Sequence, residues 1–399
     1  MKIALFHPWI KSKGGAEKVI LEFLKNTKYK VDIYTWVYDK ENTFDEFKKF
    51  NVKIIAPKFA QKLSKRHILR GLFLPLSFFS KIPLKKYDKF LISTSGVAEF
   101  ITFRNYKRGQ TYAYSHTPLR EANKKIVKWN LENRHKNKFL RKQLYLSSVG
   151  IYRIFEKMAW KKLNVIIFNS ELSKSRAEEH NLLRKQKTHV VNPPFNSLNF
   201  KKITTKKGNN FIYFSRFNLP KRQDLLLRAW KRFVEKNPKY KLILIGDIDN
   251  KEYFKKLKRI QKKTKNVEIK LNVSNEELKK YIANSYAGLF LGYQEDFGIV
   301  PLEIIMAEKP LIAVDEGGYV SLIKNNSLFY KIKEKHNRKM MIKEIAKELE
   351  NFVKKKRDKD EMDGREAGGG KTKVRTPLKQ NKKIKVKNFA KEIDKVLSS

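Results

Sequence analysis

Two glutamates eight positions apart, Glu295 and Glu303, frame a short segment that could bind a sugar nucleotide. The segment 287–291 before them is apolar and predicts a buried strand, whereas 300–306 predicts a helix with Pro301 in its first turn. Glu295 would then lie at the carboxyl end of a parallel strand, where open α/β sheets bind ligands. Its carboxylate can accept hydrogen bonds from sugar hydroxyls, and Glu303 on the helix can reach a ribose.

The residues between the two glutamates would present backbone N–H groups to an anion. They are Phe297, Gly298, Ile299 and Val300. The first N–H groups of a helix have no partner within the helix, and the helix dipole favours negative charge there. The alternative interpretation is a solvated loop glutamate followed by an ordinary acidic residue in the first turn of a helix.

A second pair of candidates carries positive charge. Arg216 follows the apolar segment 210–215, and Lys221 follows Pro220 at the start of a helical pattern. The diphosphate of a sugar nucleotide gains negative charge as it leaves, so fixed cations beside it would stabilise the transition state. A forked guanidinium and a point-like ammonium can converge on one pyrophosphate. The alternative is two solvated bases among the 90 lysines and arginines of the chain.

The first half of the chain contributes further candidates. Gly14 and Gly15 follow the apolar segment 2–6 and can bring backbone N–H groups close to a phosphate, although such a pair is usually only a turn. His116 also follows an apolar segment, and its neutral imidazole could bind a sugar hydroxyl or serve as an ordinary structural histidine. Arg120, one turn further on, could bind an acceptor phosphate or a donor group.

Short apolar segments alternate with helical patterns along the chain, which is typical of βαβ units and an α/β fold with parallel sheets. The predicted strands are 2–6, 31–35, 52–55, 89–93, 111–115, 164–168, 210–215, 241–246, 267–270, 287–291 and 310–314. If each of these is a parallel strand, the candidate residues follow strand ends and gather at one edge of a sheet.

Five segments in this order resemble retaining glycosyltransferase family 4, and in particular its mannosyltransferase-like subset. They are Gly14-Gly15-Ala16-Glu17, Tyr114 to Arg120, Asn169-Ser170, Ser215 to Arg222 and Glu295 to Glu303. The resemblance covers about residues 1–330. It implies the GT-B fold, in which two Rossmann-like parallel-sheet domains face a central cleft.

The resemblance also implies roles for the candidates. It assigns Arg216 and Lys221 to the donor diphosphate, Glu295 to the donor sugar hydroxyls and Glu303 to the ribose, with His116 completing the catalytic set. The donor would be a GDP- or UDP-sugar, and no cofactor or metal ion is predicted. Retention in the family is usually pictured as front-face attack, in which the donor phosphate helps to deprotonate the acceptor hydroxyl.

The chain departs from the family pattern at three places. Glu308 and Leu271 stand where the family commonly has glycine, and Ser321 lies where a further glutamate is usual. These changes bear on loop geometry and donor preference, and they keep open a second interpretation, a sugar-nucleotide-binding protein without catalysis.

Four segments are predicted from composition and from the resemblance. Residues 1–195 form an N-terminal, acceptor-side Rossmann-like domain, and 196–352 form a C-terminal domain that binds the nucleotide sugar. Residues 353–384 are basic and poor in apolar side chains, so we expect a flexible segment. Residues 385–399 regain helical periodicity and could form a C-terminal helix that packs back on the N-terminal domain.

Charge and hydropathy indicate the partners. The 399 residues carry a formal net charge of +50 and contain no cysteine, which excludes disulfides and thiolate chemistry. No apolar segment approaches the ~20 residues of a spanning helix, and the first ten residues do not form a signal peptide. Basic residues at 62–66 and 81–86 flank the apolar segment 71–79, so an anionic membrane surface is the predicted partner of a cytoplasmic protein bound peripherally at the inner face.

The favoured function is therefore a retaining glycosyltransferase that moves a sugar, with mannose suggested by the resemblance, from a nucleotide donor to a lipid-linked or envelope glycan acceptor. A basic nucleic-acid-binding protein is the third interpretation. The chain lacks an RNA-binding signature and a basic recognition helix, so no specific nucleic acid is predicted.

Overall fold

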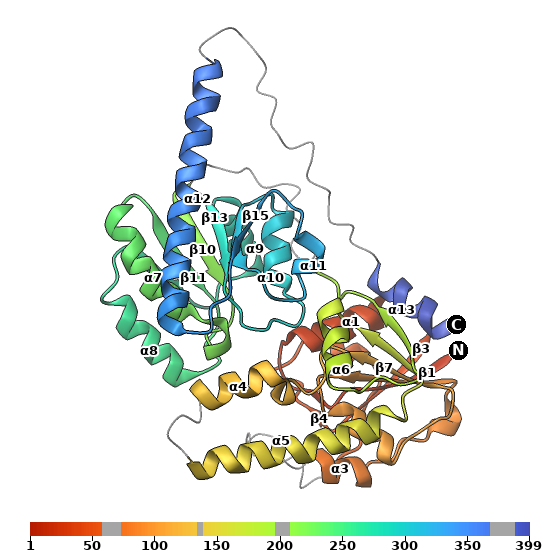
Figure 1. Cartoon of the computed structure of the whole chain (residues 1–399). Helices are drawn as coiled ribbons and strands as arrows, with labels where there is room; N and C mark the ends of the chain where they lie inside the picture. The colour runs from red at the N-terminus through yellow and green to blue at the C-terminus, as the bar shows by residue number, and fades with distance from the viewer. Residues whose placement is uncertain (58–72, 134–138, 196–207, 368–387) are drawn as a thin grey trace. The chain divides into compact units, whose positions relative to one another are not determined.

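The computed structural model describes residues 1–57, 73–133, 139–195, 208–367 and 388–399 (Figure 1). The chain divides into two compact units, one formed by Met1–Pro194 with Lys387–Ser399 and the other by Phe195–Val386. Each unit has a parallel sheet with helices packed against it. The predicted α/β class is confirmed.

In the described part of the first unit, seven strands form one sheet in the order β5-β3-β1-β6-β7-β8-β9. The strands are β1 Lys2–Phe6, β3 Lys30–Thr35, β5 Val52–Ile54, β6 Lys89–Thr94, β7 Thr111–Ser115, β8 Val165–Phe168 and β9 Lys187–Val190, with the short pair β2 Trp9–Ile10 and β4 Val37–Tyr38 outside it. The α-helices are α1 Gly15–Asn26, α3 Phe73–Phe79, α4 Lys124–Asn133, α5 Phe139–Trp160, α6 Glu171–Glu179 and α13 Phe389–Ser398, and the 3₁₀ helices are η1 Asp45–Lys49, η3 Leu84–Lys86, η4 Ala98–Phe103 and η5 Arg120–Ala122.

The second unit repeats this plan with a described sheet in the order β12-β11-β10-β13-β14-β15. Its strands are β10 Asn210–Phe214, β11 Lys241–Ile245, β12 Val267–Lys270, β13 Ala287–Phe290, β14 Leu311–Val314 and β15 Phe329–Ile332. Its helices are α7 Gln223–Lys236, α8 Lys251–Gln261, α9 Asn275–Ala283, α10 Ile299–Met306, α11 Val320–Ile323 and α12 Arg338–Ala367, with the 3₁₀ helix η6 Leu219–Lys221.

Both sheets reverse their strand order at one point. In the first unit the reversal lies between β1 and β6, and in the second it lies between β10 and β13. Helices that follow the two strands on either side of such a point leave in opposite directions, which opens a crevice at the carboxyl ends of the strands. These crevices are where each unit is expected to bind a ligand.

Each of the eleven predicted strands overlaps an observed one, with ends that differ by at most one residue. The edge strands β9 and β15 were not predicted, because their short sequences mix charged and apolar residues. The other difference is the predicted flexible segment 353–384. Helix α12 continues to Ala367, so the prediction is wrong for 353–367, and 368–384 lie outside the described residues.

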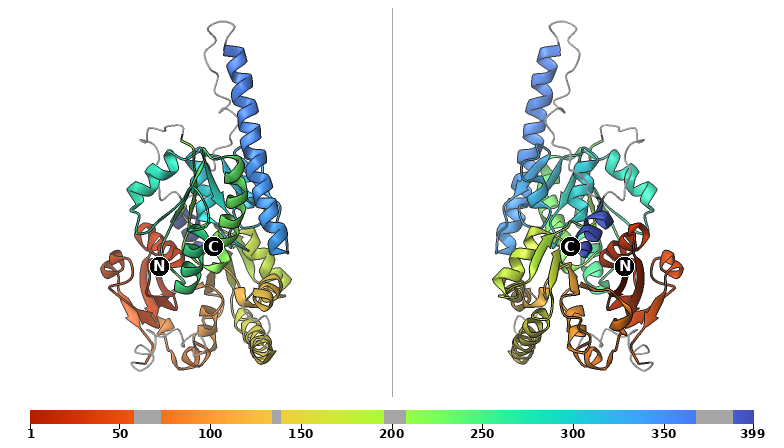
Figure 2. Two further views of the ribbon diagram at one scale, coloured as in Figure 1. Left: turned by 90° about the vertical axis from the view of Figure 1, so that its left-hand side faces the viewer. Right: turned by 90° about the vertical axis from the view of Figure 1, so that its right-hand side faces the viewer.

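The extension of α12 has a simple physical reason. Lysine, arginine and glutamate are good helix formers, so a polar composition does not by itself end a helix. The first turns of α12 are held by buried Met341, Ile345 and Leu349, and the helix lies beside α7. Beyond these turns α12 extends away from the sheet (Figure 2).

The C-terminal helix α13 packs against α1 in the first unit (Figure 1). It buries Phe389, Ile393 and Leu397 in the same apolar cluster as the inner face of α1. The Asp394 carboxylate accepts hydrogen bonds from the Thr27 hydroxyl at 2.6 Å and from the backbone N–H of the next residue at 3.1 Å. The last described helix therefore completes the core of the first unit.

Candidate functional site

The second unit places the predicted donor-binding residues at its strand reversal. Strands β10 and β13 are parallel neighbours, so their carboxyl ends meet at one edge of the sheet. Arg216 and Lys221 follow β10, and Glu295 follows β13. The sequence prediction that these residues lie at strand ends is confirmed.

Lys221 and Glu295 meet directly although 74 positions separate them. The Lys221 ammonium donates a hydrogen bond to the Glu295 carboxylate at 2.6 Å and lies 5.3 Å from the ring centre of Phe290. The two side chains are only 16% and 21% exposed, so water screens the pair less than it would a surface pair. The strand edge thus presents a cation and a carboxylate held side by side.

Arg216 lies at the same edge but turns to a different partner. Its guanidinium is 3.7 Å from the Asp249 carboxylate, and the side chain is 65% exposed. Its backbone carbonyl accepts a hydrogen bond from the Gln223 side chain at 3.0 Å, which fixes the main chain. The guanidinium itself is therefore free to reorient toward an incoming anion at little cost.

Arg222, which the sequence reasoning missed, supports Lys221 from the next position. Its backbone has φ 57°, in the left-handed region, and the residue is 5% exposed. Its guanidinium donates two hydrogen bonds to the Glu334 carboxylate, at 2.7 and 2.8 Å, and lies over the Tyr293 ring at 4.3 Å. No local pattern links positions 222 and 334, so the sequence offered no signal for this pair.

The turn before α10 depends on glycine. Gly298 precedes the helix with φ 87°, and a Cβ added there would lie 2.5 Å from the Tyr319 ring. Glu295 is tied to the neighbouring loop because its carbonyl accepts the Gly318 N–H at 3.0 Å. Phe297 is buried, and Ile299 and Val300 begin the helix half-buried. Helix α10 therefore begins at Ile299, four residues after Glu295.

Glu303, the second predicted glutamate, is 7% exposed on α10. Glu308, at the end of the same helix, has φ 57°. That backbone conformation favours glycine and costs most other residues about 1 kcal/mol, which explains why glycine is usual at this position in the resembled family. The backbone at position 308 therefore adopts the left-handed conformation that favours glycine, although the residue is a glutamate.

In the first unit, His116 belongs to a buried polar chain at the carboxyl ends of β1, β6 and β7. Its Nε2 is 2.9 Å from the Ser93 hydroxyl, which is 3.2 Å from Nδ1 of His7. Burial, followed by the nearby His116, lowers the pKa of His7 to about 3, so His7 is neutral at physiological pH. The sequence reasoning did not select His7, although its position directly after the first strand was a usable signal.

The other predicted residues of the first unit are Gly14, Gly15 and Arg120. Gly14 caps α1, and a Cβ there would lie 2.2 Å from the carboxylate of buried Glu17. Gly15 begins the helix and is exposed. Arg120 begins η5 and is half-buried.

Among the described residues, no group of three or more histidines, aspartates and glutamates is arranged to hold a metal ion. The described residues also contain no helix with the length and apolar composition needed to cross a membrane.

Comparison with known proteins places this geometry in context. The family model "Glycosyl transferases group 1" matches residues 195–365. The chain is 26% identical over 368 residues to the human GDP-Man:Man(3)GlcNAc(2)-PP-Dol alpha-1,2-mannosyltransferase, covering 80% of this chain and 73% of that protein. It is 24% identical to the alpha-1,3/1,6-mannosyltransferase ALG2 of Dictyostelium discoideum, covering 83% and 86%.

Solved structures share the fold. The glycosyltransferase WaaG, involved in lipopolysaccharide biosynthesis, aligns with a TM-score of 0.60 at 14% identity and covers 87% of this chain and 90% of that chain. HepE of Anabaena in complex with UDP aligns with a TM-score of 0.60 at 17% identity and covers 88% and 91%. The predicted GT-B fold is confirmed by these likenesses.

Proposed function

We propose that this chain, which is a GT-B glycosyltransferase with mannosyltransferase relatives, transfers mannose from GDP-mannose to a lipid-linked oligosaccharide with retention of configuration. The second unit would bind the donor and the first unit the acceptor. Support for the donor and the acceptor comes from the human relative, whose name specifies GDP-mannose and a dolichyl diphosphate oligosaccharide. HepE was solved in complex with UDP, so UDP-mannose is the alternative donor to compare with GDP-mannose.

The observation that carries the proposal is the pairing of Lys221 with Glu295 at the strand reversal, next to the start of α10. A donor diphosphate beside Lys221 and the first N–H groups of α10 would meet fixed positive charge and N–H donors. Glu295, held by Lys221, would accept hydrogen bonds from the donor sugar, and Glu303 would bind the ribose. Arg216 would turn from the exposed Asp249 carboxylate to the diphosphate.

The transfer step follows from these positions. The acceptor hydroxyl oxygen forms a bond to the anomeric carbon, the bond from that carbon to the diphosphate oxygen breaks, and the hydroxyl proton passes to the leaving phosphate. Lys221 and Arg216 stabilise the charge that develops on the diphosphate. The chain formed by His7, Ser93 and His116 would bind a sugar hydroxyl in the first unit. No metal ion takes part in the proposed step.

Nucleotide binding gives the direct test of this proposal. GDP at 100 times its dissociation constant is expected to stabilise the second unit by about 2.7 kcal/mol, which corresponds to an increase in Tm of about 5–10 °C. UDP at the same concentration should give a smaller shift. Transfer of mannose from GDP-mannose to a polyprenyl diphosphate oligosaccharide is then measured with EDTA present. A chain that neither binds GDP nor transfers mannose would rule out the proposal.

We also propose that the first unit binds an anionic membrane at the cytoplasmic face. Helix α5 exposes a stripe of apolar side chains at helical spacing, which we call the α5 stripe: Leu140, Leu144, Ile151, Ile154 and Met158, exposed by 47–70%. Helix α3 adds exposed Phe78 and Phe79. Arg141 and Lys157 on α5 supply positive charge on the two flanks of the stripe, about 100° to either side of it on a helix of 3.6 residues per turn. An apolar helix face flanked by cations fits a lipid interface. Of the basic residues that suggested membrane binding, 62–66 lie outside the described residues.

Replacing Leu144, Ile151 and Ile154 together with glutamine is expected to weaken binding to phosphatidylglycerol vesicles at least about tenfold, because each buried apolar side chain contributes about 1.5–3 kcal/mol when it is fully transferred from water. Flotation at low salt measures the bound fraction. Met340→Gln, at a position 56% exposed in the second unit, serves as the control and should bind like the wild type. A wild-type chain that fails to float with these vesicles would remove the membrane proposal.

A further inference from the structure

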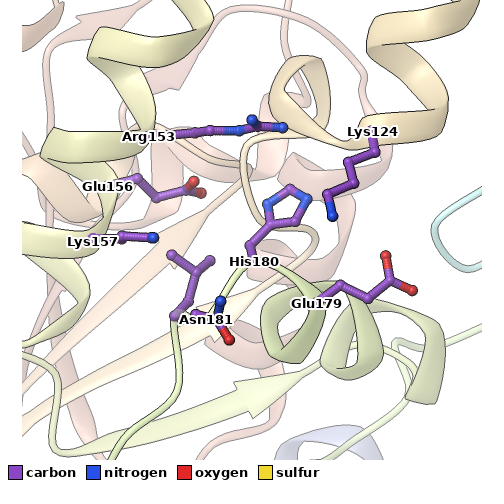
Figure 3. A pocket seen from close by; sticks show the side chains of 8 residues that line it. Lys124, Arg153, Glu156, Lys157, Glu179, His180 and Asn181 are labelled. Carbon is purple, nitrogen blue, oxygen red and sulfur yellow. The ribbon is translucent and has the colours of Figure 1, made fainter.

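A pocket of about 170 Å³ lies in the first unit where three helices meet. Lys124 comes from the start of α4, Arg153, Glu156 and Lys157 from the last turns of α5, and His180 from the end of α6 (Figure 3). Drug-sized ligands occupy about 300–1,000 Å³, so this pocket suits a smaller group.

The imidazole of His180 points into this pocket with neither nitrogen hydrogen-bonded. It is 8% exposed, and both Nδ1 and Nε2 lack a partner among the described residues. Figure 3 shows the Lys124 ammonium and the Arg153 guanidinium turned toward the ring. A buried polar group without a partner costs about 1–3 kcal/mol, so a ligand that forms a hydrogen bond with the His180 ring would stabilise the pocket.

Charge in the pocket is predominantly positive. Burial, followed by the coulombic effect of Arg153, lowers the pKa of His180 to about 4, so the ring is neutral at physiological pH and can donate one N–H. Burial also raises the pKa of Glu156 well above its usual range, and the neighbouring Glu99 adds to this rise. The Glu156 Oε2 atom has no described partner.

The remaining carboxylate is Glu179, which is exposed on the rim. Lys124, Arg153 and Lys157 outnumber the two acidic residues of the pocket, Glu156 and Glu179. Three cations together with the N–H donor of His180 match a phosphoryl group, which offers several acceptor oxygens and up to two negative charges.

We propose that this pocket binds the diphosphate of the lipid-linked acceptor, an assignment that rests on the proposed function. Arg153 and Lys157 stand on α5, the same helix that carries the α5 stripe. On a helix of 3.6 residues per turn these two cations lie roughly 100–140° around α5 from the stripe, on a different side of the helix. A carrier lipid anchored in a bilayer beside α5 can then place its diphosphate among the three cations.

The variant Lys124→Gln with Lys157→Gln tests the assignment. Both lysines are exposed, so the substitutions leave the fold intact. The full-length chain is titrated with inorganic pyrophosphate, and its histidine ring signals are followed by NMR. We expect the wild type to show a shift of the His180 signals and the double variant to bind at least about tenfold more weakly. The matched control is Lys30→Gln with Lys49→Gln, two exposed lysines of the first unit outside the pocket and outside the basic stretch 81–86, with the same loss of charge.

Vesicles separate the two possible sources of the diphosphate. Phosphatidylcholine vesicles that carry a polyprenyl diphosphate are compared with vesicles brought to equal charge by phosphatidylglycerol. Preferential binding to the polyprenyl diphosphate, lost in the pocket variant and kept in the control, supports the proposal. Pyrophosphate binding without a preference for the phosphorylated lipid would overturn the lipid assignment, and equal pyrophosphate binding by wild type and pocket variant would overturn the site.

A GDP titration of the same variant distinguishes this inference from the proposed function. Normal GDP binding combined with an unresponsive pocket refutes the pocket alone. Absence of GDP binding from every form of the chain counts against the proposed function, whereas a specific response of the pocket to pyrophosphate would still identify a diphosphate site.

Discussion

Replacing Lys221 with methionine is expected to lower kcat for mannose transfer by about 10²- to 10³-fold, the loss typical of removing one preorganised donor to a developing negative charge. Methionine keeps much of the length and the apolar contact over Phe290 but cannot donate to the Glu295 carboxylate or to a phosphate. The Glu295 side chain is 21% exposed and can take up water in place of the ammonium, so the fold should survive. Initial rates with saturating donor measure the effect.

Lys231→Met is the matched control for this variant. Lys231 is exposed on α7 in the same unit, and its replacement should change kcat less than twofold. If Lys221→Met retained kcat within threefold while its thermal stability matched that of the wild type, the diphosphate role of this lysine would be excluded.

Glu334→Ala is expected to destabilise the second unit by about 3–5 kcal/mol, because it leaves the Arg222 guanidinium buried without its counterion. The Arg222 side chain is only 7% exposed and makes two hydrogen bonds to Glu334. The same substitution should reduce transfer, since Arg222 fixes the main chain directly after Lys221. Urea unfolding, monitored through the hydrogen exchange of residues 208–367, measures the loss in the free energy of unfolding of the second unit.

The ion pair between Lys236 and Glu350 provides the contrast. Their side chains are 72% and 39% exposed at a distance of 3.4 Å, so Glu350→Ala should cost less than about 1 kcal/mol. Equal destabilisation by the two substitutions would show that the buried pair has no special role in holding the turn.

The strand prediction succeeded because buried parallel strands leave continuous apolar segments in the sequence. The placement of Lys221 and Glu295 could be predicted for a related reason, since both follow such segments and the carboxyl ends of neighbouring parallel strands coincide. Their direct contact could not be predicted, because it depends on the turn that Arg222 and Gly298 impose.

The supporting contacts were beyond sequence reasoning. Arg222 and Glu334 are 112 positions apart, and His7 and Ser93 are 86 apart, so no periodicity relates the partners. The pocket around His180 draws on three helices for the same reason. Side chains of this kind are brought together by the packing of whole elements, whereas a local pattern specifies only the element itself.

The order of segments along the chain has a consequence for biosynthesis. The first unit needs residues 387–399 to close its core over α1, yet these follow the whole of Phe195–Val386. A ribosome adds about 5–20 residues per second, so the inner face of α1 stays open to water for roughly 10–40 s after Pro194 has been made. During that interval the apolar cluster of the nascent first unit lacks Phe389, Ile393 and Leu397, so the apolar surface that they cover is exposed and can bind chaperones.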